Sequence, residues 1–147
     1  MMLIDANLLL YAYDPSTPQH AAARRWLEEM LSGPMPVLLP WNSLLAFLRI
    51  ATSPQIWEQP LLVQEAADIV EEWLASPNVI VPAPGERHWT ILRDLLCGAQ
   101  CRGRLVPDAH LAALAIEHGA TLCTNDRGFA RFPRLRILNP LDQPQPS

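Results

Sequence analysis

The chain has 147 residues, half of them hydrophobic, with a formal net charge of −4 and a pI of about 5.5. This length suits one domain with a substantial core, so we predict one folded unit over residues 1–140 and a flexible, proline-rich tail over residues 141–147. The acidic total argues against a uniformly basic nucleic-acid surface. All eleven basic residues are nevertheless arginine, which binds phosphate in a bidentate manner. Four lie within ten positions near the C-terminus: Arg127, Arg131, Arg134 and Arg136.

The N-terminus and the cysteines indicate the compartment. No basic segment opens the chain and Asp5 interrupts its first apolar run, which argues against a secretory signal. No stretch approaches the roughly 18 apolar residues of a membrane span. The three cysteines are odd in number and lack a zinc-binding spacing. We therefore expect reduced, mostly buried thiols in a cytoplasmic protein that does not enter a membrane.

Short apolar strands alternate with helical segments along the chain. The first strand, MLIDA, ends near Asp5. Further strands are predicted at residues 37–40, 78–81, 120–124 and 136–138, and helices at 18–31, 41–52, 60–75, within 85–101 and at 107–119. Thr17 and Pro18 are expected to start the first helix, and Pro107 the last. This alternation predicts an α/β sandwich, a parallel sheet covered by helices on both faces.

Three aspartates occupy positions where such a fold binds ligands. Asp5 closes the first strand, Asp126 follows the strand at 120–124, and Asp108 opens a helix. Ligands of open α/β sheets bind at the carboxyl ends of the strands, so we expect these side chains to converge on one edge. Gathered carboxylates require a cation, and hard oxygen ligands select Mg²⁺ or Mn²⁺. Such an ion activates water and stabilises a phosphate undergoing displacement, which indicates a nuclease site.

Each residue also has a plainer interpretation. Asp5 could be the N-cap of a helix over ANLLLYAY, Asp108 could complement a helix dipole, and Asp126 could stabilise a turn. His110 and His118 are interpreted as partly buried or surface histidines rather than ligands. The order and context of the three aspartates, not any one of them, carry the nuclease prediction.

Three segments resemble PIN-domain ribonucleases, specifically the VapC-type toxins of bacterial toxin–antitoxin pairs. They are MLIDANLLLYA, VPDAHLAALAIEHGATLCTND and RGFARFPRLRILNP. The family has an Asp closing the first strand, an Asp opening a late helix, and a T-x-D after the next strand. Here these are Asp5, Asp108 and the pair Thr124 and Asp126.

The resemblance implies a PIN-like α/β/α sandwich around a parallel sheet. It also implies Mg²⁺- or Mn²⁺-dependent endonucleolytic cleavage of RNA, a VapB-like antitoxin as inhibitor, and a homodimer. The predicted catalytic residues and metal ligands are Asp5, Asp108 and Asp126. Asn7 and Thr124 are expected to support the ligands or their waters, and Arg49 and Arg127 to bind the RNA backbone. An apolar groove between the helices at 18–31 and 41–75 would suit an antitoxin helix, while the same residues could equally form a dimer interface or part of the core.

The chain departs from the family in one respect. The family usually has a Glu in the second helix, whereas no acidic residue lies between Glu29 and Glu58, and the equivalent position is near Phe47. Asn42 or Ser43 could hold a metal-bound water instead. The number of metal ions and the strength of activity are thus open, and an RNA- or partner-binding module without catalysis is the alternative hypothesis.

A phosphatase-like hydrolase with Asp5 as nucleophile is a third hypothesis. That class has D-x-D-x-T early in the chain. Here Asp5 is followed by Ala6, Asn7, Leu8 and Leu9, so both the second Asp and the Thr are missing. We rank it last.

Overall fold

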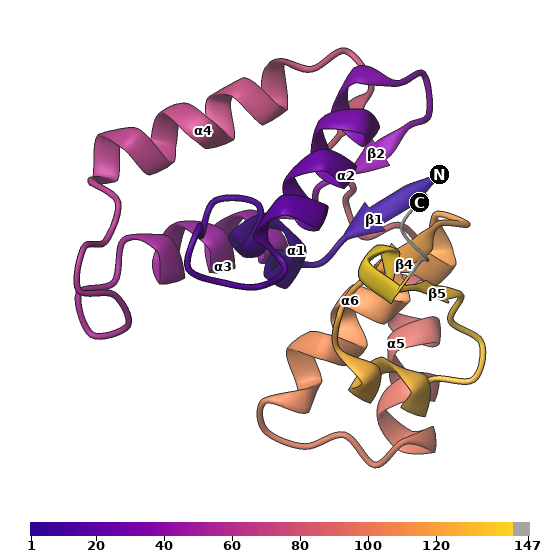
Figure 1. The fold of residues 1–147 in the computed structure, drawn as a ribbon. Coiled ribbons are helices and arrows are strands. Elements are labelled where there is room, and N and C mark those ends of the chain that lie inside the picture. Colours follow the sequence, from indigo (N-terminus) through magenta and orange to yellow (C-terminus); the bar gives the residue numbers. More distant parts are fainter. Residues whose placement is uncertain (143–147) are drawn as a thin grey trace.

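The computed structural model describes residues 1–142, which form a five-stranded parallel sheet with helices on both faces (Figure 1). The strand order is β3-β2-β1-β4-β5. The elements in chain order are β1 (Met2–Ile4), α1 (Ala6–Tyr11), α2 (His20–Ser32), β2 (Val37–Leu38), α3 (Trp41–Ala51), α4 (Val63–Ala75), β3 (Val79–Ile80), α5 (His88–Gly98), α6 (Leu105–Glu117), β4 (Thr121–Cys123), the 3₁₀ helix η1 (Arg127–Arg131), β5 (Ile137–Leu138) and the 3₁₀ helix η2 (Pro140–Asp142).

The strands supply two separate hydrophobic cores because successive side chains of a strand point to opposite faces. Leu3, Leu38 and Leu122 pack toward α5 and α6, while Ile4 and Val37 pack toward α1, α2, α3 and α4. Figure 1 shows α5, α6 and η1 on one side of the sheet and α1 to α4 on the other. The predicted α/β sandwich is therefore confirmed.

The two central strands place their following residues side by side. β1 and β4 pair in register from Met2 and Thr121 to Ile4 and Cys123, and the N–H of Asp5 extends the ladder to the Cys123 carbonyl at 3.0 Å. The chain order reverses between β1 and β4, since β2 and β3 lie on one side of β1 and β5 on the far side of β4. Such a switch point opens a crevice at the carboxyl ends of the strands. Asp5 and the residues after Cys123 lie there.

A short helix follows Asp5 where the predicted elements contain none. Residues 6–11 form α1, and the Asp5 carboxylate accepts the Ala6 N–H at 2.8 Å. The N-cap interpretation of Asp5 is thus confirmed, and it coexists with a position at the sheet edge. A helix of six mostly apolar residues shows too little periodicity to be separated from the strand before it.

Other helix starts also differ from the prediction. The first predicted helix begins at His20, not at Pro18. Residues 17–19 form a turn before it, in which the Thr17 hydroxyl contacts the Gln19 side chain and the Thr17 carbonyl accepts the His20 N–H. α4 begins three residues later than predicted, where the Glu65 carboxylate accepts the Leu62 N–H at 2.9 Å. α6 begins at Leu105, two residues before Pro107, which falls in its first turn where no N–H is required.

Three further expectations concern the ends and the thiols. Leu141, in η2, packs against the core, and the remaining tail residues 143–147 lie outside the described part of the chain. The cysteines form no disulfide in the described residues; Cys123 is buried, but Cys97 is exposed, so the expectation of mostly buried thiols was wrong. No helix within residues 1–142 is long and apolar enough to cross a membrane.

Candidate active site at the sheet edge

Thr124, which follows β4, joins the elements that meet at the switch point. Its buried hydroxyl donates to Asp5 Oδ2 at 2.7 Å and accepts the Asp126 N–H at 3.0 Å. It also lies 3.3 Å from the Asn7 Nδ2 donor, while Asn7 Oδ1 accepts the Asn125 N–H at 3.4 Å. A hydroxyl has one donor and two acceptor sites, so Thr124 has no hydrogen-bonding capacity left. The predicted supporting residues, Asn7 and Thr124, therefore bridge the ends of β1 and β4.

Asp5 is a half-buried carboxylate in an unfavourable electrostatic position. Burial raises its pKa, and the charges of Asp108 and Asp126 raise it further. Hydrogen bonds from Thr124 and from the Ala6 N–H act in the opposite direction without cancelling the effect. No positive charge therefore compensates the ionised form of Asp5, and a bound cation would provide one.

The other two aspartates approach from separate elements. Asp108 lies in the first turn of α6, and its pKa is raised by burial and then by the charge of Asp126. Asp126 is exposed and caps η1, where Oδ1 accepts the Gly128 N–H at 2.8 Å. The structure thus brings all three predicted aspartates within electrostatic reach of one another. We call Asp5, Asp108 and Asp126 together the carboxylate edge.

The donor set of the carboxylate edge fits a hard divalent cation. Within residues 1–142, no three Asp, Glu, His or Cys side chains are drawn together closely enough to enclose a metal on their own. An ion held there would complete its coordination with water, as Mg²⁺ commonly does. The raised pKa values of Asp5 and Asp108 are the observation that favours a cation, because a positive charge would relieve the repulsion.

The start of α3 contributes no acidic side chain to the edge. Phe47, near the expected glutamate position, is fully buried and packs with its ring centroid 4.7 Å from that of Trp73. The buried Ser43 hydroxyl donates to the Ile4 carbonyl at 2.7 Å, so its proton is used by the backbone and its lone pairs are left as acceptors. Asn42 is exposed. That Asn42 or Ser43 holds a metal-bound water stays a prediction.

The structure does not test the prediction that Arg49 and Arg127 bind the RNA backbone. Arg49 and Arg127 are exposed, and no hydrogen bond or ion pair within the described chain connects either to the carboxylates. Instead, Arg131 and Arg104 lower the pKa of Asp108 electrostatically, Arg131 more strongly. Arg104 precedes Asp108 by four residues, a spacing that could have indicated it. The approach of Arg131 depends on the fold of η1.

Sequence reasoning also missed a second polar group, which we call the histidine cluster: His88, His110 and Glu117. His88 Nε2 lies 2.9 Å from His110 Nδ1, and His88 Nδ1 lies 3.8 Å from Glu117 Oε1. Burial, and then the neighbouring His88, lower the pKa of His110. The Glu117 carboxylate accepts the Gly85 and Arg87 N–H groups at 2.7 and 3.0 Å, which lowers its pKa. Through these two hydrogen bonds Glu117 connects the loop before α5 to the end of α6, whereas His88 Nδ1 is buried without a hydrogen-bond partner among the described residues.

Comparisons with known proteins place the chain in a family. The family model for the PIN domain matches residues 2–135. The chain therefore belongs to the PIN-domain family. Its curated relatives define the branch: Ribonuclease VapC43 of Mycobacterium tuberculosis is 40% identical over 142 residues, covering 97% of each chain. Ribonuclease VapC37 of the same species is 41% identical, over 92% of this chain and 94% of that one.

Solved structures confirm the fold. VapBC2 from Rickettsia felis, bound to a promoter DNA fragment, contains a chain that matches with a TM-score of 0.67 at 18% identity, over 94% of this chain and 97% of that chain. VapC20 of Mycobacterium tuberculosis, a toxin that cleaves the sarcin-ricin loop, matches with a TM-score of 0.64 at 17% identity, over 92% and 99%. The PIN-like architecture expected from the sequence is thus confirmed.

Proposed function

We propose that this protein is a Mg²⁺- or Mn²⁺-dependent endoribonuclease, acting in the cytoplasm as the toxin of a toxin–antitoxin pair. The carboxylate edge supports the proposal, because three aspartates from three separate elements lie within electrostatic reach of one another near the point where the sheet reverses its order. The VapC ribonucleases that share about 40% of its sequence supply the substrate class.

In this proposal Asp5, Asp108 and Asp126 hold the cation, directly or through water. When bound, the ion supplies an activated water and offsets charge on the phosphodiester. Thr124 keeps the Asp5 carboxylate oriented by its 2.7 Å hydrogen bond, and the Asp126 N–H fixes the Thr124 hydroxyl in turn. Cleavage leaves 5′-phosphate and 3′-hydroxyl ends.

The direct test is cleavage of an RNA pool by purified, antitoxin-free protein with Mg²⁺, Mn²⁺ or EDTA. Asp5→Asn is expected to reduce cleavage below detection, because it removes one of three negative ligands. Asp68→Asn, the same chemical change on the exposed side of α4, is the matched control and should cleave like wild type. Cleavage by Asp5→Asn at the wild-type rate would refute the site.

One observation favours a second candidate, an RNA- or partner-binding module without catalysis. α3 places Phe47 in the core and supplies no carboxylate to the edge. If the protein binds RNA but cleaves none in either metal, and if divalent ions do not raise its Tm, the binding module is the better account.

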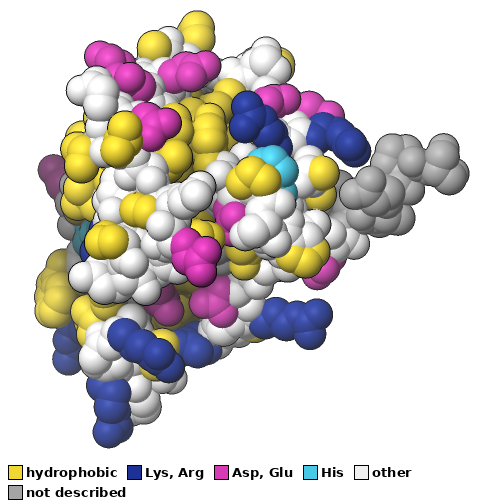
Figure 2. Space-filling model, turned by 60° about the vertical axis from the view of Figure 1, so that its left-hand side comes forward, with side chains coloured by type: hydrophobic (Ala, Val, Ile, Leu, Met, Phe, Trp, Pro, Cys, Tyr) yellow, Lys and Arg dark blue, Asp and Glu magenta, His cyan; other side chains and the backbone are white. Residues whose placement is uncertain are grey.

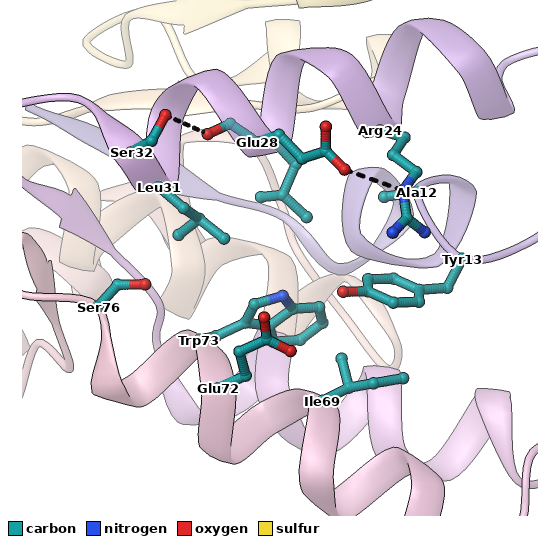
Figure 3. Close-up of a pocket in the computed structure, with 11 residues that line it drawn as sticks. Ala12, Tyr13, Arg24, Glu28, Leu31, Ser32, Ile69, Glu72, Trp73 and Ser76 are labelled. Atoms are coloured by element: carbon teal, nitrogen blue, oxygen red, sulfur yellow. Dashed lines mark hydrogen bonds and ion pairs between the residues drawn. The ribbon is translucent and has the colours of Figure 1, made fainter.

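A groove between α2 and α4 is the proposed antitoxin site (Figure 3). It has a volume of about 520 Å³, and its lining includes Tyr13, Leu27, Ile69 and Trp73. The Trp73 indole N–H is buried without a hydrogen-bond partner among the described residues, and Figure 3 shows its nitrogen turned toward the space between the helices. The Tyr13 hydroxyl also interacts with this indole, and an amphipathic helix could fill the apolar floor beside the two rings.

Substitution on the groove floor tests the antitoxin site. Ile69→Glu should abolish neutralisation by a co-expressed antitoxin, while the free protein still cleaves RNA. Leu74→Glu, at an exposed position of the same helix outside the groove, should still be neutralised. Equal neutralisation of both variants would exclude the groove. The proposal also includes a homodimer, which sedimentation of the free protein would test.

A further inference from the structure

The η1 segment holds an arginine side chain over a glycine at the carboxylate edge. A Cβ atom at Gly128 would lie 3.0 Å from Arg131 Nη2 and 3.0 Å from Asp126 Oδ1. The guanidinium of Arg131 therefore occupies the space beside the Asp126 carboxylate that a larger side chain at 128 would fill.

The backbone that presents Arg131 is anchored on both sides. Phe129 and Phe132 are buried in the core that α5 and α6 share, with ring centroids 6.2 Å apart, and the Phe132 N–H donates to the Phe129 carbonyl at 3.1 Å. Asp126 fixes the start of the segment through the Gly128 N–H at 2.8 Å. Arg131 is thus carried by a short, well-packed turn rather than by a free loop.

The guanidinium itself is uncommitted within the described chain. Arg131 is exposed, and no hydrogen bond or ion pair of 4.0 Å or less joins it to any of residues 1–142. Arg131 acts on Asp108 through its charge alone, lowering the pKa of that carboxyl without forming a pair that would occupy its donors. Its donors lie near the Asp126 carboxylate without pairing with it. On the face drawn in Figure 2, arginine side chains gather along the lower part, with acidic side chains above them.

We propose that Arg131 is the phosphate-binding residue of the carboxylate edge, and that its guanidinium binds the non-bridging oxygens of an RNA phosphate positioned for cleavage. The planar guanidinium matches two phosphate oxygens, and a charge-assisted pair of this kind is stronger than a neutral hydrogen bond. The inference rests on the proposed ribonuclease function. It assigns to Arg131 the role that the sequence suggested for Arg127 and Arg49.

The test measures binding separately from cleavage. A fluorescein-labelled single-stranded RNA is titrated with Asp5→Asn protein, which leaves the RNA intact, and anisotropy gives the Kd. Adding Arg131→Gln should weaken binding about tenfold, the effect of losing one strong charged hydrogen-bond pair. It should also reduce the slope of log Kd against log salt by about 0.7, the value for one phosphate contact on a single strand.

Three further variants make the test specific. Arg25→Gln, on the exposed surface of α2, makes the same change in net charge and should leave Kd unchanged. Arg131→Lys should restore part of the affinity, because it keeps the charge but not the bidentate geometry. Gly128→Ala keeps the arginine but crowds both its guanidinium and the Asp126 carboxylate, so it should weaken binding as well.

The outcomes separate this inference from the proposed function. Equal affinity of the Arg131→Gln and parent proteins, or an equal loss in Arg25→Gln, overturns the role of Arg131. If wild-type protein cleaves RNA and Arg131→Gln does so with an unchanged KM, the inference fails while the ribonuclease function stands. If wild-type protein neither cleaves nor binds RNA, both fail.

Discussion

The two ends of α6 carry polar groups of opposite character. The first turn contributes Asp108 to the carboxylate edge, where like charges meet, and the last residue, Glu117, contributes to the histidine cluster, where acceptors meet donors. The environment raises the pKa of Asp108 and lowers that of Glu117. On one helix, therefore, the surroundings destabilise the ionised form of Asp108 and stabilise the ionised form of Glu117.

This difference distinguishes the carboxylate edge, which has the character of a ligand site, from the histidine cluster, in which Glu117 stabilises the fold. The histidine cluster needs nothing further for Glu117, because two backbone N–H groups already bind it. At the carboxylate edge, Asp5 receives two hydrogen bonds but no positive partner, and burial still raises its pKa. Uncompensated charge gathered at a switch point is the pattern expected of a binding site.

The largest expected effect is a difference in RNA cleavage between substitutions at the two ends of α6. Asp108→Asn should abolish RNA cleavage without lowering Tm, because it removes a repelled charge. Glu117→Gln should cleave at the wild-type rate but lower Tm by about 3 °C, since losing one charge-assisted hydrogen bond costs about 1 kcal/mol. Cleavage assays and thermal melts of both variants give the answer. Loss of cleavage in Glu117→Gln with a normal Tm would contradict the division.

A smaller effect is expected at Thr124, which serves the edge without contacting substrate. Thr124→Val keeps the volume but removes the hydroxyl that bonds Asp5 Oδ2 and the Asp126 N–H. Loss of such an outer contact typically costs about 10–100-fold in metal affinity or activity. Thr124→Ser should recover most of the loss. Equal defects in both variants would show that the methyl packing, and not the hydroxyl, matters at this position.

The smallest effect is the pH dependence of stability in EDTA. Because the folded-state pKa of Asp5 lies above its unfolded value of about 3.8, ionised Asp5 destabilises the fold at neutral pH. That penalty is relieved as pH falls through the folded-state pKa. Asp5→Asn should therefore have a higher Tm than wild type at pH 7, and the difference should shrink toward pH 4.

The opposite pH dependence is expected at Glu117, whose pKa is lowered. Its stabilisation is present above its unfolded value and is lost as pH falls through the folded-state pKa. Glu117→Gln should therefore have a lower Tm than wild type at pH 7, with the difference shrinking in acid. Tm differences of the same sign in the two variants would contradict the comparison.

The sequence predicted the sheet and the three aspartates because short, wholly apolar strands and the residues that end them are local signals. Strands were predicted at all five observed places, and Thr124 and Asn7 followed from their nearness to Asp5 and Asp126. The helix α1 was considered only through the N-cap interpretation of Asp5 and was left out of the predicted elements, because its mostly apolar residues resemble a continuation of the strand before it. The N-cap and edge interpretations of Asp5 looked exclusive in sequence, yet both hold.

The unpredicted parts depend on contacts between distant residues. The histidine cluster joins His88 to His110 and Glu117 across two helices, and no spacing along the chain indicates it. Arg131 was counted among the C-terminal arginines but not assigned to the edge. Its position depends on the 3₁₀ turn of η1, which brings its guanidinium close to Gly128. Phe47 could be identified as the departure from the family pattern, but its burial needed the packing of α3.

The most direct test of the central claim is calorimetric titration of the apo protein with Mn²⁺. The account predicts one site per chain in wild type, lost in Asp108→Asn and retained in Glu117→Gln, so that the two carboxylates of α6 separate by metal binding alone. Equal Mn²⁺ binding by wild type and Asp108→Asn, or no binding by wild type at all, would contradict the claim that the carboxylate edge is a cation site.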